Sequence, residues 1–266
     1  IDLMIIPNLA IHMSRSSNES KQLNPQKDLL PLCGGNLTKD GFEEMIAKES
    51  GVEKEDILSY DLFLYNRMRG TTLGINEEFV AAPKLDDLEC AYSSIEGMLN
   101  AKLSKDYVTV CAVFDNEEVG SGTKQGAGST FFPEVLKRIS YLCEKNEEEY
   151  YMAVADSFML SADNAHAVHP NYQDKTDPTN RPYINEGIVL KYNASQKYTT
   201  DANSAALVKY LCKKEKIKCQ VFFNRSDMLG GSTLGNILTG QVSIKAADIG
   251  LPQLSMHSTY ETAGCK

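Results

Sequence analysis

Several features that would assign this chain to a large protein class are absent. No apolar run approaches the roughly 20 residues that span a bilayer, and no signal peptide is visible, so no membrane partner is expected. The seven cysteines are scattered without a Cys-x-x-Cys pair, which predicts reduced thiols in a cytoplasmic protein. No basic stripe offsets the net charge of -9, which argues against nucleic-acid binding.

Three common catalytic motifs are missing as well. The absence of His-Glu-x-x-His excludes single-zinc proteases of that type, and neither Gly-x-Ser-x-Gly nor a Walker Gly-Lys-Ser/Thr is present. The glycine-rich stretch 120–128 has the wrong spacing for a dinucleotide fingerprint, because residues 115–119 separate it from the preceding apolar run.

Four short segments instead combine acids and histidine in an unusual pattern. Each follows an apolar run that resembles a strand, and together they offer an isolated acid, an adjacent acid pair, another acid and a histidine. Carboxylate and imidazole groups are the ligands that a pair of hard or borderline divalent cations needs. The pattern predicts part of a two-metal hydrolase. The four segments are 84–88, 115–121, 161–171 and 255–258.

Residues 81–266 alternate between strand-like and helix-like patterns. This alternation predicts an α/β catalytic domain with a mostly parallel sheet sandwiched by helices. The active site of such a sheet lies beyond the carboxyl ends of its strands, where the acidic segments fall. Strands are expected at 107–114, 186–192 and 219–224, apolar runs at 151–160 and 241–249, and helices at 86–103, 133–145 and 201–214.

Residues 1–80 have a different character and are predicted to be part of a second domain. Thr38 precedes a helical pattern at 39–49, and 56–66 has the composition of a strand. Segment 67–83 is expected to be irregular, as a domain junction. The polar segment 14–31 is interpreted as a mobile loop, which leaves open a role in protein interactions.

Each candidate residue also has an ordinary structural explanation. Glu117 and Glu118 could form a solvated acidic turn; in an extended segment, however, one could hold a metal while the other faces a bound water. Asp86 and Asp87 could simply cap the helix that follows them. A lone histidine near apolar residues, such as His257, is more often structural than a ligand.

The motifs taken together resemble the aspartyl aminopeptidase family, relatives of yeast aminopeptidase I. The similar segments, in order, are Ile6–His12, Asp115–Ser121, Ser161–Tyr172 and Leu254–Ser258. The resemblance implies a zinc-exopeptidase-like fold with a β-rich dimerisation domain. It also implies two zinc ions, with other divalent metals possible, peptide substrates, and dimers that build a dodecamer.

Specific roles follow from the same resemblance. Asp86 would bridge the two zinc ions through a segment with a cis peptide bond to Asp87. Asp163 would serve one ion, and Glu118 and His257 the other. The general base would be Glu117.

Two further residues would bind substrate. His12 would reach the active site of a neighbouring subunit, and Lys191 would contact an acidic substrate side chain. Family members carry another zinc-binding histidine in an N-terminal catalytic segment, and none of the four histidines here fits it. We therefore interpret residues 81–266 as an incomplete catalytic domain.

The resulting hypothesis is a di-zinc aminopeptidase that removes N-terminal Asp or Glu from peptides. One alternative is a broader aminopeptidase that prefers neutral residues. Another is a non-catalytic assembly or cargo protein that keeps the fold.

Overall fold

The structure is a computed structural model that describes residues 3–15 and 21–266. The chain divides into two compact units, Ile1–Arg67 and Met68–Lys266, and each is described by itself. Within the described residues, no helix combines the length and apolar character needed to cross a membrane.

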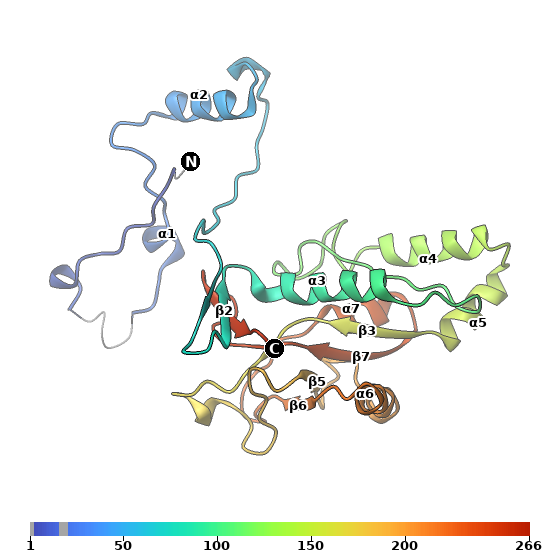
Figure 1. Cartoon of the computed structure of the whole chain (residues 1–266). Coiled ribbons are helices and arrows are strands. Elements are labelled where there is room, and N and C mark those ends of the chain that lie inside the picture. The colour runs from blue at the N-terminus through green and yellow to red at the C-terminus, as the bar shows by residue number, and fades with distance from the viewer. Residues whose placement is uncertain (1–2, 16–20) are drawn as a thin grey trace. The chain divides into compact units, whose positions relative to one another are not determined.

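The first unit contains little regular structure (Figure 1). Helix α2 (Lys39–Ser50) begins after Thr38, whose hydroxyl accepts a hydrogen bond from the Gly41 amide, and it ends at Gly51 in the left-handed conformation. The helix predicted at 39–49 is therefore confirmed, since both of its boundaries are set by local capping. The remaining elements are short: η1 (Ile11–Met13), α1 (Pro25–Asp28) and η3 (Lys54–Asp56).

The strand predicted at 56–66 is wrong. Residues 57–66 form no regular element, and the side chains of Leu58 and Phe63 are 95% and 85% exposed. A strand needs a neighbour that satisfies its backbone groups, and no described strand pairs with this segment. The predicted mobile loop at 14–31 lies partly outside the described residues, and its later part contains α1.

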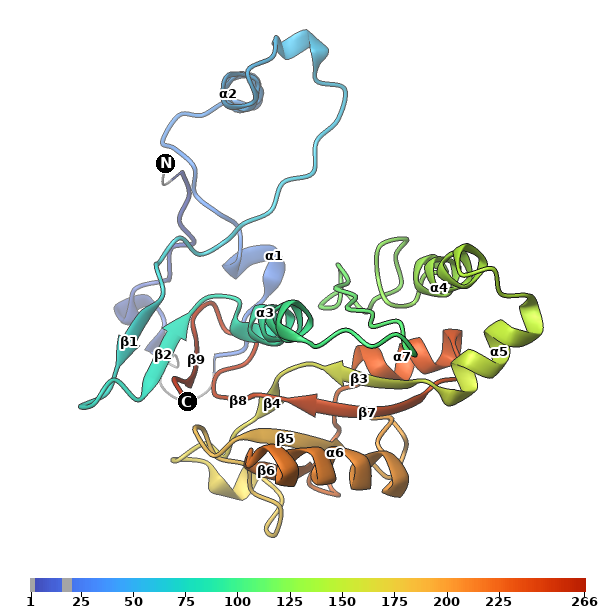
Figure 2. The same ribbon diagram turned by 45° about the vertical axis from the view of Figure 1, so that its right-hand side comes forward.

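A mixed sheet organises the second unit (Figures 1 and 2). Its described strands run in the order β3-β7-β5-β6; β3 pairs parallel with β7, β5 pairs parallel with β6, and β5 with β7 is antiparallel. Most pairings are parallel, so the predicted α/β fold is confirmed. The strands are β3 (Phe158–Ala162), β7 (Lys245–Gly250), β5 (Ile188–Tyr192) and β6 (Cys219–Phe223).

Helices cover both faces of this sheet. Phe158 packs into a core cluster with residues of α6, whereas its neighbour Met159 packs into a second cluster with residues of α4 and α7. Consecutive residues of a strand point to opposite faces, so α6 lies on one face and α7 on the other. The helices are α3 (Leu85–Asn100), α4 (Phe131–Leu142), α5 (Glu147–Asp156), α6 (Ala202–Glu215) and α7 (Leu234–Gln241).

The strand predicted at 107–114 is also wrong. This segment has no regular structure, and Tyr107 and Val108 are 77% and 61% exposed rather than covered on both faces. The segment is apolar, as a buried strand would be, but no described strand pairs with it to form a ladder. The acid pair that follows is therefore not held at the end of a sheet strand.

Two smaller sheets bring the candidate site together. Strands β4 (Ala165–His166) and β8 (Pro252–Gln253) pair just beyond the ends of β3 and β7. Strands β1 (Thr71–Leu73), β2 (Phe79–Ala82) and β9 (Glu261–Gly264) form an antiparallel sheet with β2 in the middle. The expected irregular segment 67–83 thus contains a hairpin. Because α3 follows β2 and the His257 turn precedes β9, this sheet draws both segments to one place.

Candidate metal centre

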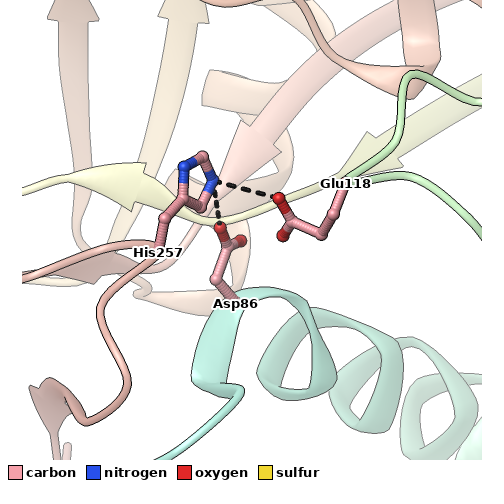
Figure 3. A group of neighbouring side chains, drawn as sticks. All are labelled: Asp86, Glu118 and His257. Atoms are coloured by element: carbon pink, nitrogen blue, oxygen red, sulfur yellow. Dashed lines mark ion pairs between the residues drawn. The ribbon is translucent and has the colours of Figure 1, made fainter. Parts of the chain in front are cut away.

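Three side chains from distant segments converge in the second unit (Figure 3). Nε2 of His257 lies 3.1 Å from Oδ2 of Asp86 and 3.3 Å from Oε2 of Glu118. Ligand atoms that each lie about 2 Å from one ion are at most about 4 Å apart, so these atoms have the spacing of a metal site.

A second acidic group overlaps the first. Asp86, Asp87 and Asp163 each place a carboxylate oxygen within 4.8 Å of the others, and the ligand atoms of the first group lie equally close together. Asp163 follows β3 directly, at the strand end where the sequence predicted it. Because Asp86 belongs to both groups, its carboxylate occupies the position from which one residue can bridge two ions.

The electrostatics of this cluster favour a bound cation. Burial, and then the charges of Asp163 and Glu118, raise the pKa of Asp86 to about 7. Burial and Asp163 raise the pKa of Asp87 to about 8. The Oδ1 atom of Asp86 is buried and has no hydrogen-bond partner among the described residues. Zinc accepts oxygen and imidazole ligands of this kind, and its charge would offset the repulsion, so these residues fit the metal.

The Asp86 segment has the backbone conformation that the resemblance implied. The peptide bond between Asp86 and Asp87 is cis. The alternative explanation, that these acids cap α3, is wrong for Asp87, because its carboxylate accepts a hydrogen bond from the amide of Asn164 at 3.1 Å. Asn164 also donates from its side chain to the carbonyl of Leu85, which ties the start of α3 to the end of β3.

Glu117 and Glu118 lie in a turn rather than in the extended segment that was expected. The amide of Gly120 donates to the carbonyl of Glu117 at 2.8 Å. Glu118 joins His257, whereas Glu117 lines a cavity of about 110 Å³. Burial, followed by the charges of Asp163 and Glu118, raises the pKa of Glu117. The two neighbouring side chains therefore lie in different places, and a turn rather than a strand separates them.

Lys191 lines the same cavity from β5. Its side chain is 3% exposed, and its Nζ lies 3.4 Å from Oδ2 of Asp163 and 5.4 Å from the centre of the Tyr198 ring. Burial raises the pKa of Tyr198 to about 12, so its hydroxyl stays neutral at physiological pH. The wall of the cavity thus carries one buried cation beside the acidic cluster.

The remaining predicted residue, His12, is exposed in η1 of the first unit. Because the two units are described separately, its relation to the metal cluster stays a prediction. Of the other histidines, His166 lines the cavity, and His169 instead packs against Tyr172.

The sequence assigned no role at the site to Asp87, Asn164 or Glu261. Asp87 completes the second acidic group, and Asn164 connects it to β3. Glu261 accepts hydrogen bonds from the amides of Asp86 and His257. Gly231 and Thr233, just before α7, line the cavity. The position of Asn164 next to Asp163 was an available signal, but nothing local marks Glu261.

Comparison with known proteins gives a consistent result. The family model described as "Aminopeptidase I zinc metalloprotease (M18)" matches residues 2–266. A probable M18 family aminopeptidase 2 of Clostridium novyi is 48% identical over 269 residues. That alignment covers 98% of this chain and 61% of the relative, so the chain spans less than two thirds of its length.

Solved structures of similar proteins share the fold. The structure of the Ape4 and Nbr1 complex matches with a TM-score of 0.89 and 34% identity, over 98% of this chain and 55% of that chain. The crystal structure of prApe1 matches with a TM-score of 0.87 and 28% identity, over 98% and 60%. The S. cerevisiae mApe1 dodecamer matches with a TM-score of 0.77 and 27% identity, over 98% and 58%.

Proposed function

Since this chain belongs to the aminopeptidase I zinc metalloprotease (M18) family, we propose that it carries the metal-binding and catalytic residues of a di-zinc aminopeptidase. The enzyme would remove N-terminal Asp or Glu from peptides. The observation that carries the proposal is the pair of acidic groups that share Asp86, with Glu117 beside them on the cavity wall.

Asp86 would bridge the two ions. Glu118 and His257 would complete one site, and Asp163 the other. The buried and unpartnered Oδ1 of Asp86 supports this role, because an acceptor in that position needs a cation or a proton. Once bound, the ions would supply Lewis acidity to the scissile carbonyl and to the attacking water.

Glu117 would act as the general base. Its carboxylate lines the cavity, and its raised pKa makes it a better proton acceptor than an exposed glutamate. A carboxylate oxygen of Glu117 would take a proton from the attacking water and deliver it to the leaving amine. Glu118, one residue away, would stay committed to the ion that it shares with His257.

Lys191 would set the preference for acidic residues. It is a buried cation on the cavity wall, and an ammonium group has three donors, of which one is directed to Asp163. A carboxylate on the substrate could accept another. A broader preference for neutral residues is the competing possibility for the same site.

The proposed assembly is based on the solved structure of the S. cerevisiae mApe1 dodecamer. Dimers of this chain would form the unit of a larger homo-oligomer, with residues 1–80 in the dimerisation domain and residues 81–266 in the catalytic domain. His12 would then be presented to the active site of a neighbouring subunit.

The test combines metal analysis with substrate profiling on the full-length protein. We expect two zinc ions per subunit and cleavage of aminoacyl substrates that begin with Asp or Glu in preference to Ala or Leu. Zinc-loaded protein that cleaved neutral residues best would favour the broader aminopeptidase. Protein without stoichiometric metal and without activity would instead favour a non-catalytic assembly or cargo role.

A further inference from the structure

The buried carboxylate of Glu261 connects two segments of the metal centre. Glu261 is 2% exposed at the start of β9. Its Oε2 accepts a hydrogen bond from the backbone amide of Asp86 at 2.9 Å. Its Oε1 accepts one from the backbone amide of His257 at 2.7 Å. Both oxygens of one carboxylate are therefore committed to the backbone of residues whose side chains face each other.

No regular element joins these two segments directly. Asp86 follows β2, whereas His257 lies in the turn between β8 and β9. The pairing of Ala82 with Glu261 aligns β2 and β9. It stops four residues before Asp86 along one segment and four residues after His257 along the other. The side chain of Glu261 spans this remaining gap. His257 also has a φ of 65°, so its turn depends on contacts beyond local backbone preference.

We infer that Glu261 is a positioning residue that fixes the spacing between Asp86 and His257 and thereby sets the zinc affinity of their shared site. The inference rests on the proposed metal function of that site. A carboxylate suits the task because it offers two acceptor oxygens and no donor. Glutamine at this position would offer one acceptor and would turn its NH₂ group toward an amide N–H. Hydrogen bonds to an ionised acceptor are also stronger than neutral ones.

The competing explanation is that Glu261 only stabilises the β2–β9 sheet. The two explanations differ in what the metal-free protein does. A purely structural residue would lower the melting temperature in EDTA when it is replaced, and zinc binding would fall only through that instability. Replacing a positioning residue would lower zinc affinity but leave the metal-free protein folded and near wild-type stability. In that state Glu261 adds a negative charge to an already repulsive cluster, so its removal costs little.

The experiment measures zinc dissociation constants by competition with a chromophoric chelator, on full-length wild type, Glu261→Gln and Glu89→Gln. Glu89 is the matched control: it is a partly buried acid beside Glu261 whose pKa is raised by burial, and it accepts a hydrogen bond from the side chain of Asn164 rather than from the amides of Asp86 and His257. Melting temperatures in EDTA are measured on the same samples. We expect Glu261→Gln to weaken zinc binding about 10- to 100-fold, the usual effect of removing a residue that orients a ligand. Glu89→Gln should bind zinc nearly as wild type does.

The outcomes separate cleanly. Equal zinc affinity in Glu261→Gln and wild type would overturn the inference and leave the proposed function intact. Loss of affinity that only follows a large loss of metal-free stability would also overturn it. If Glu261→Gln does not fold, Glu261→Asp keeps the charge but is too short to reach both amides, and it should show the same loss of affinity. Wild-type protein that binds no zinc would overturn the proposed function itself, and the inference with it.

Discussion

The Nζ of Lys191 lies 3.4 Å from the carboxylate of Asp163, and this ion pair is nearly excluded from solvent. The buried ammonium therefore has a charge partner before any substrate arrives. This cation does not require an acidic substrate as its partner, because Asp163 already pairs with it. What the geometry supports is a cation with donors remaining, placed between a proposed metal ligand and the cavity.

This relationship makes Lys191→Met informative. For substrates with N-terminal Asp or Glu, kcat/KM should fall by about 100-fold or more, because the buried side-chain carboxylate of the substrate would lose its cationic partner. Cleavage of Ala or Leu substrates should fall much less. The control is Lys209→Met, which removes a cation that lies over Tyr192 and does not line the cavity. Equal losses on acidic and neutral substrates would restrict Lys191 to its partnership with Asp163.

The adjacent acids should separate catalysis from metal binding. Glu117→Gln in the full-length enzyme should retain zinc and lower turnover by about 100-fold or more, because the proton acceptor is removed. Glu118→Gln should lower zinc content, because the carboxylate of Glu118 would bind the same ion as His257 and Asp86, whose ligand atoms lie within 4.8 Å of it. Zinc analysis and single-turnover kinetics on both variants check this. Zinc loss in Glu117→Gln with retention in Glu118→Gln would mean that the two roles are exchanged.

The acidic cluster predicts an unusual pH dependence for the metal-free protein. The pKa values of Asp86 and Asp87 are raised to about 7 and about 8, from an ordinary value of 3.8. At pH values between about 4 and about 8, these two carboxyl groups bind more protons in the folded state than in the unfolded state. The free energy of unfolding should therefore decrease as pH rises from about 4 to about 8. Between pH 5.5 and pH 8 the decrease should be several kcal/mol, about 2 kcal/mol from Asp86 and about 3 kcal/mol from Asp87.

Urea unfolding of the full-length protein in EDTA at the two pH values measures this effect. Asp87→Asn should flatten the dependence, because one of the two titrating groups is removed. Added zinc should reverse the trend, since protons and metal compete for Asp86. A metal-free protein that became more stable toward pH 8 would contradict the raised pKa values.

The proposed role of His12 is tested by mixing subunits. His12→Phe and Glu117→Gln oligomers should each be nearly inactive. If His12 serves a neighbouring active site, mixed oligomers should recover activity, because some sites then combine an intact Glu117 with an intact His12. Native mass spectrometry verifies the mixing. Verified mixed oligomers without recovered activity would assign His12 to its own subunit or to no catalytic role.

Local features of the structure were predictable from local sequence. Helix α6 begins at a capping box between Asp201 and Ser204, and α2 begins at Thr38. These boundaries depend on residues within one helical turn, so the pattern is enough to place them. Strand β5 was equally clear from its apolar run, and its parallel neighbour β6 covers its backbone groups.

Segment 107–114 shows where local pattern fails. Its composition is that of a buried strand, yet a strand exists only where another strand supplies hydrogen-bond partners, and here the described residues supply none. The same limit applies to 56–66. Whether an apolar run becomes a strand is a property of its neighbours in space.

For the site, the sequence by itself determined the chemistry: which acids and which histidine are available, and that Asp163 ends a strand. Only the tertiary structure decided how they are shared. It placed Asp86 in both acidic groups, and it paired Lys191 with Asp163. It also set Glu261 between the amides of Asp86 and His257. Asp86 and Glu261 are 175 positions apart in the chain. A contact over that separation depends on how the sheets fold together, which no local spacing encodes.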